Sequence, residues 1–128
     1  MKKNNPKISV VIPAHNEEEL IGRAIDSVLA NKYSNKEIIV VNDGSTDKTP
    51  EIVKSYMELN NSIKLINFEE GHSAAFARNK GTEKVKGDII IFLDADTIIN
   101  DIFLEEISKF KDVAQGFITL NFPLRTTW

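Results

Sequence analysis

The chain of 128 residues contains no cysteine. This absence excludes a disulfide framework, a thiolate metal site and a cysteine nucleophile. The sequence also has no apolar run of membrane-spanning length, and its lysine-rich start shows no signal peptide. We therefore expect a cytoplasmic protein, and leave open a peripheral association with the inner membrane face.

Three glycine-containing motifs are absent as well. No G-x-G-x-x-G follows the first predicted strand, which argues against a dinucleotide cofactor. The chain contains neither the P-loop pattern of nucleotidases nor the G-x-S-x-G elbow of hydrolases. Its formal net charge of −3 argues against a nucleic-acid partner, because such proteins present a basic surface. A phosphate ligand would thus need help from a metal.

The residues that are present predict one α/β domain. Of the residues, 41% are hydrophobic and 27% are charged, as in ordinary soluble proteins. Strand and helix patterns alternate along the chain, which favours a doubly wound, mostly parallel sheet. The expected strands are 8–12, 37–42, 63–68, 88–93 and 113–120, and the expected helices lie near 20–29, 50–57, 73–86 and 103–110. We expect residues 1–7 to be frayed and 8–128 to form the domain.

Several element boundaries have specific signals. Pro13 is expected to stop the first strand. Asn16 is expected to be the N-cap of the first helix, with Glu19 in the capping-box position. Thr49 followed by Pro50 predicts the N-cap and first residue of the second helix.

The most informative feature is a pair of aspartates, Asp94 and Asp96, after the apolar run 88–93. This run is typical of a central strand buried on both faces. Residues i and i+2 of an extended chain point the same way, so the two carboxylates would repel each other unless a cation lies between them. The alternative is a turn into the next helix, but two aspartates that end a buried strand are costly without a partner. The pair therefore predicts a divalent metal, with a phosphate ligand sharing it.

Two other strand ends are also polar. Residues 13–17 follow the first strand and residues 42–47 follow the second. Taken singly, each segment is explained by a turn or a helix start. Because the carboxyl ends of parallel strands meet at one edge of a sheet, the three segments together predict a binding crevice.

Four segments together resemble the inverting family 2 glycosyltransferases, which have the GT-A nucleotide-sugar-binding fold. They are VVIPAHNE at 10–17, VVNDGSTD at 40–47, ARNKG at 77–81 and FLDADT at 92–97. The resemblance runs from Ile8 to about Lys111. It implies transfer of a sugar, with inversion, from a nucleoside-diphosphate sugar in the presence of Mn²⁺ or Mg²⁺.

The resemblance also implies roles for residues that contact the nucleoside. The backbone around Pro13 and Ala14, with the side chain of Glu17, resembles the first contact to the nucleoside. Asp43 resembles the residue that accepts a hydrogen bond from an N–H of the base. Uracil suits such a carboxylate, which favours a UDP-sugar, although guanine offers N–H donors too.

Further roles concern the diphosphate and the metal. Asp94 and Asp96 resemble the DxD motif of the family, whose first aspartate faces the ribose or donor sugar and whose second binds the metal. Arg78 lies where the family places a helix bordering the donor site, and it is a candidate to bind an acidic residue or the diphosphate. A metal bridging the phosphates would neutralise the leaving group.

The chain departs from the family in its length. Members are longer, and their second half carries the acceptor site and, in most, an aspartate as general base. No acidic residue follows Asp112, and the chain ends abruptly at Trp128. We therefore expect a truncated piece that lacks the acceptor half and the general base, so that the acceptor, a saccharide or a lipid phosphate, is unknown.

Two other functions are possible. Sugar nucleotidyltransferases also use a doubly wound sheet and metal-binding aspartates, but they usually carry a glycine-rich basic loop after the first strand. Here that loop is 13–17, which has neither glycine nor a lysine or arginine. A non-catalytic α/β module would use acidic strand ends for Mg²⁺ alone.

Overall fold

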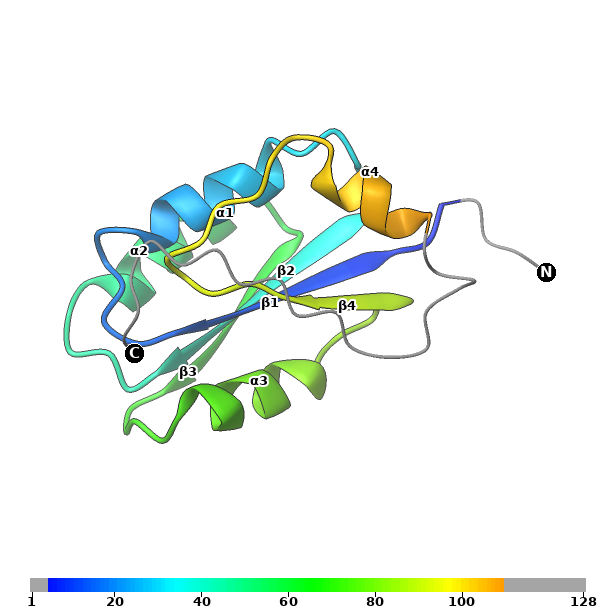
Figure 1. Ribbon diagram of the computed structural model, residues 1–128. Helices are drawn as coiled ribbons and strands as arrows, with labels where there is room; N and C mark the ends of the chain where they lie inside the picture. Colours follow the sequence, from blue (N-terminus) through cyan, green and yellow to red (C-terminus); the bar gives the residue numbers. More distant parts are fainter. Residues whose placement is uncertain (1–4, 110–128) are drawn as a thin grey trace.

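The computed structural model describes residues 5–109, which form a four-stranded parallel sheet with helices on both faces (Figure 1). The strands are β1 (Ile8–Ala14), β2 (Lys36–Asp43), β3 (Ile63–Phe68) and β4 (Ile89–Phe92). The helices are α1 (Ile21–Leu29), α2 (Thr49–Leu59), α3 (Ala74–Thr82) and α4 (Phe103–Ser108). All three strand pairings are parallel, in agreement with the predicted α/β class.

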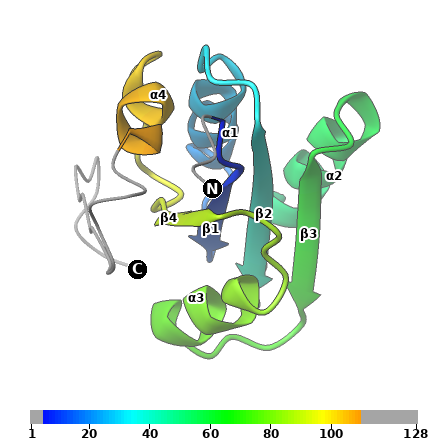
Figure 2. The same ribbon diagram turned by 90° about the vertical axis from the view of Figure 1, so that its right-hand side faces the viewer.

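The helices form two layers, one on each face of the sheet. Figure 2 shows α1, α2 and α4 on one side and α3 on the other. Alternate residues of the central strands therefore enter two cores, with Val10 and Val40 in the larger one and Val11 and Val41 in the smaller. Every residue of β1 is buried, because a strand covered on both faces needs apolar side chains throughout. This arrangement is the predicted doubly wound sheet.

The strand order is β3-β2-β1-β4. The chain moves outward from β1 to β2 and β3, then crosses the α3 face and places β4 on the other side of β1. The order therefore reverses between β1 and β4. In open α/β sheets a ligand binds outside the carboxyl ends of the strands at such a switch point.

Within residues 5–109 strand β4 lies at the edge of the sheet, and the further strand predicted at 113–120 falls outside these residues, so a central position for 88–93 stays a prediction. Strand β4 is limited to Ile89–Phe92, it pairs only with β1, and its four side chains are half-buried. In this part of the chain the central strands are β1 and β2.

Strand β1 also differs from its prediction, because it continues through Pro13 to Ala14. The backbone carbonyl of Val11 accepts a hydrogen bond from Leu93, so Val11 faces β4. Pro13, two residues on, turns its nitrogen to the same side, where pairing with β4 has already ended at Val11 and Phe92. The missing N–H therefore costs no ladder hydrogen bond.

Asn16 does not cap α1, contrary to the capping-box prediction. The helix begins at Ile21, and the backbone carbonyl of Glu17 accepts the N–H groups of Leu20 and Ile21. Asn16 instead has a left-handed backbone with φ of 51°. Helix α2 begins at Thr49, one residue earlier than predicted, with Pro50 in its first turn.

Helix α3 begins as its sequence indicates but ends early. The Ser73 hydroxyl accepts a hydrogen bond from the Phe76 N–H, so Ser73 is the N-cap. The helix ends at Thr82, four residues before the predicted end. A Cβ on Gly87 would lie 2.4 Å from Ser9 Oγ, so the chain after the helix runs tightly against β1.

The start of the described chain is held in place, unlike the frayed segment expected for residues 1–7. Pro6 is buried and its carbonyl accepts a hydrogen bond from the Tyr33 hydroxyl. The Lys7 N–H donates to Asp88 Oδ2. Residues 1–4 and the predicted strand 113–120 lie outside the described residues. Within residues 5–109, no helix has the length and apolarity needed to span a bilayer.

Candidate functional site

The predicted site residues lie around the switch point of the sheet. Pro13 and Ala14 end β1, Asp43 ends β2, and the loop after β4 carries Asp94 and Asp96. Glu17 follows β1 and is buried, and Arg78 lies on α3. Because β2, β1 and β4 are neighbours, the structure confirms that the three polar strand ends meet at one edge.

Asn16 joins the loop after β1 to the loop after β2. Its N–H donates to Ser45 Oγ at 2.9 Å, and its side-chain Oδ1 accepts the N–H of Thr46 at 2.7 Å. The left-handed backbone of Asn16 allows both contacts, and asparagine tolerates this conformation better than most residues. The sequence motif therefore encodes a contact between loops rather than a helix cap.

Two further hydrogen bonds secure the same pair of loops. The Glu17 N–H donates to Thr49 Oγ1 at 2.9 Å, and the Glu18 N–H donates to Asp47 Oδ2 at 3.2 Å. Asp47 also accepts the N–H and hydroxyl of Thr49, the first residue of α2. Burial raises the pKa of Asp47, but these donors outweigh burial and the net pKa is lowered. The loops are thus fixed by an ionised carboxylate.

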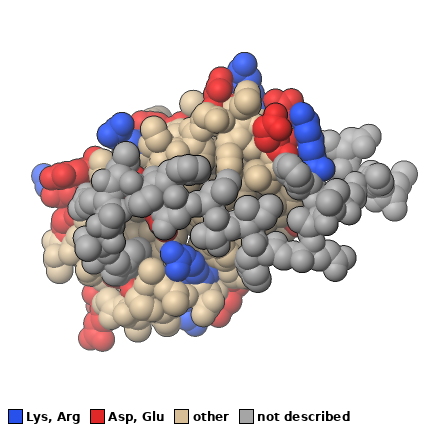
Figure 3. Space-filling model, in the orientation of Figure 1, with Lys and Arg blue, Asp and Glu red and all other residues tan. Residues whose placement is uncertain are grey.

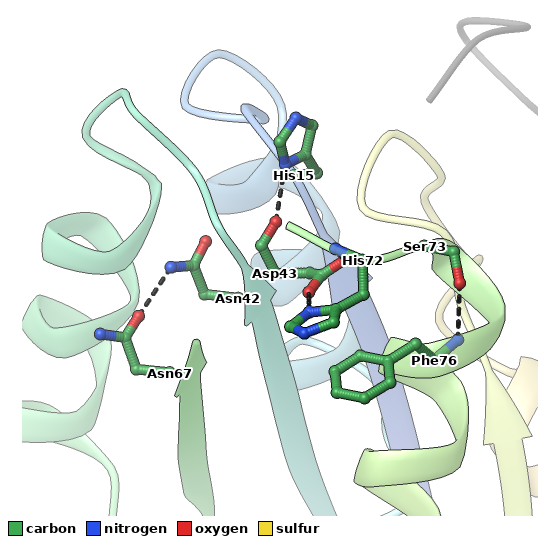
Figure 4. A network of polar contacts seen from close by, with 7 residues as sticks. All are labelled: His15, Asn42, Asp43, Asn67, His72, Ser73 and Phe76. Carbon is green, nitrogen blue, oxygen red and sulfur yellow. Dashed lines mark hydrogen bonds and ion pairs between the residues drawn. The ribbon is translucent and has the colours of Figure 1, made fainter. Parts of the chain in front are cut away.

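Asp43 is the most enclosed acid of the site, with 1% of its side chain exposed. Its Oδ2 accepts the backbone N–H of His72 at 2.8 Å, and its Oδ1 accepts the Nδ1–H of the same residue at 2.9 Å (Figure 4). The backbone oxygen of Asp43 accepts from His15 Nδ1 at 2.7 Å. A backbone carbonyl can only accept, so His15 is the donor in this contact.

The ring of His72 lies against two phenylalanines. It stacks on Phe76 with centroids 3.9 Å apart and meets the edge of Phe68 at 5.7 Å. Phe68 is the register partner of Asp43 on the neighbouring strand. One residue earlier on the same two strands, Asn42 Nδ2 donates to Asn67 Oδ1 at 2.6 Å.

Gly44 lets the loop after β2 approach the loop after β3. Gly44 has φ of +70°, and a Cβ built on it would lie 2.2 Å from the backbone nitrogen of Gly71. Its N–H donates to the carbonyl of Phe68 at 2.9 Å. This close approach places His72 next to Asp43.

The two aspartates after β4 have different surroundings. Asp94 is half-buried and its Oδ1 lies 3.4 Å from a guanidinium nitrogen of Arg78. Asp96 is buried, and the Thr97 hydroxyl lies 3.4 Å from its Oδ1. The Thr97 N–H donates to the Asp94 carbonyl, so 94–97 is a turn and not an extended segment. The prediction that both carboxylates share one face of a strand is therefore wrong, because the strand ends at Phe92.

The donor set still suits a hard cation that is shared with a ligand. Within residues 5–109, no group of three or more histidine, cysteine or acidic side chains is placed to hold a metal. Mg²⁺ and similar ions are commonly bound by one or two carboxylates together with substrate phosphates. Asp94 and Asp96 therefore fit Mn²⁺ or Mg²⁺ when a diphosphate supplies further oxygens.

Sequence reasoning missed the two histidines. His15 and His72 both contact Asp43, and no sequence pattern indicated either contact. His72 is 29 positions from Asp43, and no spacing rule connects them. The only available signal was the neighbouring glycine, Gly71, which permits a close loop contact.

Known proteins share both the sequence and the fold. The poly-beta-1,6-N-acetyl-D-glucosamine synthase of Staphylococcus aureus is 38% identical over 120 residues, which cover 92% of this chain and 29% of the synthase. The crystal structure of S. aureus TarS 1–349 in complex with UDP-GlcNAc has a TM-score of 0.74 and 30% identity, over 83% of this chain and 31% of that one. The mannosyltransferase PcManGT from Pyrobaculum calidifontis, in complex with GDP-Man and Mn²⁺, has a TM-score of 0.76 and 26% identity, over 84% and 33%.

These proportions show that the chain spans about a third or less of each of these three proteins. The profile of Glycosyl transferase family 2 matches residues 9–122. With that match over most of its length, and with the doubly wound fold of the solved relatives, the chain belongs to glycosyltransferase family 2.

Proposed function

We propose that this chain is the donor-binding part of a glycosyltransferase that takes its sugar from a UDP-sugar, with inversion and with a divalent cation. The observation that carries the proposal is the meeting of Asp43, Asp94 and Asp96 at the switch point of the sheet, in a chain of this family. Each acid has a separate task in the proposal, and the tasks follow from their surroundings.

Asp43 is suited to recognise the base. Its neighbours in the free protein are N–H donors, so its carboxylate is an acceptor. Uracil presents one N–H between two carbonyls, and backbone amides near Pro13 and Ala14 suit those carbonyls. The complex of TarS with UDP-GlcNAc supports this base, whereas the complex of PcManGT with GDP-Man supports guanine as the alternative.

Asp94 and Asp96 are suited to the diphosphate end of the donor. The two carboxylates would hold Mn²⁺ or Mg²⁺, which when bound neutralises the charge that develops on the departing diphosphate. Arg78 adds a fixed positive charge beside Asp94. Among the coloured atoms of Figure 3, basic and acidic side chains both occur, mostly toward the rim of the face.

The transfer itself needs more than this chain. Inversion requires direct displacement at the anomeric carbon by an activated acceptor, and residues 5–109 supply the donor side of that reaction. We propose that the acceptor site and general base belong to a further part of the intact protein. A cytoplasmic location, with peripheral association at the inner membrane face, stays a prediction.

Calorimetric titration tests the donor site directly. The 128-residue chain is titrated with UDP in the presence of Mn²⁺ and, in parallel, in the presence of a chelator. We expect measurable binding with Mn²⁺ and a large loss in the chelator. Asp96→Asn should weaken binding by at least about tenfold, since even outer-shell partners of metal ligands contribute that much.

Two results would count against the proposal. Affinity for UDP that is unaffected by the chelator and by Asp96→Asn would remove the role of the metal. Tighter binding of GDP than of UDP would change the base. A pyrophosphorolysis assay with UTP as the product distinguishes the nucleotidyltransferase alternative, and a positive result would replace the proposed transfer reaction.

A further inference from the structure

The carboxylate of Asp43 is enclosed by its neighbours. Only 1% of its side chain is exposed, and each of its oxygens already accepts a hydrogen bond from His72. A base that donates to Oδ1 from the position of the imidazole must therefore displace the ring. The covering ring itself is 41% exposed, so it lies on the solvent side of the acid.

The imidazole makes the contacts that a nucleobase would make. It is a planar heterocycle, it donates a ring N–H to Asp43 Oδ1, and it stacks on Phe76 with a 20° angle between the rings (Figure 4). An N–H to a carboxylate combined with stacking on an aromatic ring is how proteins commonly hold a base. The buried acceptor is thus satisfied by a side chain of the same chain.

The two hydrogen bonds from His72 differ in how they can be broken. The backbone N–H belongs to the segment that Gly71 and the Ser73 cap fix against β2 and α3. The ring is attached through two rotatable bonds, and its exposed position leaves room for rotation toward solvent. Rotation would open Oδ1 and leave Oδ2 bonded to the backbone, so Asp43 would stay oriented.

From these contacts we infer that the His72 ring is an intramolecular competitor of the nucleobase, which must leave Asp43 Oδ1 before a base can bind there. The inference rests on the proposed function. Phe76 and Phe68 hold the ring in the closed position, and the ligand class is a nucleotide whose base carries a ring N–H. His72 therefore lowers the affinity for the nucleotide without contacting the bound base.

If the His72 ring competes with the base, His72→Ala should raise the affinity for UDP, and if the ring supports Asp43, the same variant should lower it. If the ring competes, its removal eliminates the cost of opening, and UDP should bind about tenfold more tightly, as expected for one hydrogen bond to a charged acceptor. If the ring merely supports Asp43, the variant should bind UDP more weakly. Phe76→Leu keeps the imidazole but removes the ring on which it stacks, so the affinity for UDP should rise by a smaller factor, about threefold.

The experiment compares UDP affinity in Mn²⁺ for the wild-type 128-residue chain, both variants and Lys84→Ala, an exposed control beyond α3. The ring signals of His72 in nitrogen-15 spectra should change on saturation with UDP. Equal or weaker binding by His72→Ala beside normal wild-type binding, or unchanged ring signals, would overturn the inference alone. Absence of UDP binding by both wild type and His72→Ala would overturn the proposed function and the inference with it.

Discussion

Asn16 Oδ1 accepts the backbone N–H of Thr46 at 2.7 Å, across two loops that are separate in sequence. This contact depends on the left-handed backbone of Asn16, with φ of 51°. The residue therefore contributes to the site in two ways, through its side-chain acceptor and through its conformation. The loops after β1 and β2 both carry residues that are predicted to contact the nucleotide-sugar donor. The hydrogen bonds of Asn16 therefore connect the stability of the fold to donor binding.

Two substitutions separate these contributions. Asn16→Gly removes the acceptor but keeps the left-handed conformation accessible, and it should lower the free energy of unfolding by about 1 kcal/mol. Asn16→Ala also imposes the cost of that conformation, so its loss should be about 2 kcal/mol or more. Urea denaturation measures both. Equal losses in the two variants would show that the backbone conformation carries no cost here.

Gly44 and Gly71 lie on either side of one loop contact, so alanine substitutions at the two positions can be compared directly. Gly44→Ala would place a methyl group 2.2 Å from the Gly71 nitrogen at a φ of +70°, so the loops must separate. We expect a loss of about 3 kcal/mol or more, together with loss of UDP binding. Gly71→Ala places its Cβ 3.4 Å from the Asp43 oxygen, an ordinary contact, and should cost less than about 1 kcal/mol. A reversed ranking in thermal or urea unfolding would contradict this packing.

Glu37 forms a buried polar contact at the opposite end of the sheet from the site. It is the register partner of Ser9, and its Oε2 accepts both the Ser9 hydroxyl at 2.6 Å and the Lys86 N–H at 2.6 Å. These bonds fasten the connection between α3 and β4. Burial raises the pKa of Glu37, but the two donors and the charges of Lys7 and Lys64 outweigh it, so the pKa lies below its ordinary 4.5.

A depressed pKa gives this contact a defined pH dependence. Its contribution to stability is fully present above 4.5 and is lost as the pH falls through the lower folded value. Glu37→Gln should reduce the free energy of unfolding by about 1–2 kcal/mol at neutral pH and by less in acid. Glu58→Gln, at an exposed position on α2, is the control. Urea midpoints on both sides of pH 4.5 measure the effect, and an equal loss at both would show that the charge is not involved.

The sequence predicted the sheet because its strands are strongly apolar. The runs ending at Asp43 and Asp94 have no competing helical pattern, so their parallel arrangement and the meeting of their polar ends followed from general rules. Boundaries were less accurate where a tertiary contact changed a local rule. Pro13 stays in β1 because β4 ends beside it, and Asn16 leaves its helix because Thr46 provides a better partner.

The contact between Asp43 and His72 was beyond sequence reasoning for a physical reason. The two residues are 29 positions apart, and their approach depends on the close contact of Gly44 with Gly71. Asp43 was assigned from the resemblance, which describes what the acid binds when a donor is present. In the structure the same acid accepts hydrogen bonds from His72, and no local sequence pattern indicates this contact.

The last prediction concerns the ion pair of Arg78 and Asp94. It distinguishes a contribution of Arg78 to the free energy of unfolding from a contribution to the affinity for UDP. Their 3.4 Å contact joins side chains that are 39% and 35% exposed. Because solvent screens such pairs, Arg78→Ala should change the free energy of unfolding by less than about 1 kcal/mol. If Arg78 turns to the diphosphate when a donor binds, the same variant should weaken UDP binding about tenfold or more, since a charge-assisted contact to phosphate is lost.

Comparison with uridine isolates the phosphate contribution. Uridine lacks the diphosphate, so Arg78→Ala should leave its affinity unchanged while the affinity for UDP falls. Arg78→Lys keeps the positive charge but not the planar pair of donors, and it should recover part of the affinity. Lys80→Ala, on the same helix, is the control for general loss of positive charge. An equal fall for UDP and uridine would place Arg78 at the nucleoside instead, and an unfolding loss well above 1 kcal/mol would show that the ion pair with Asp94 is structural.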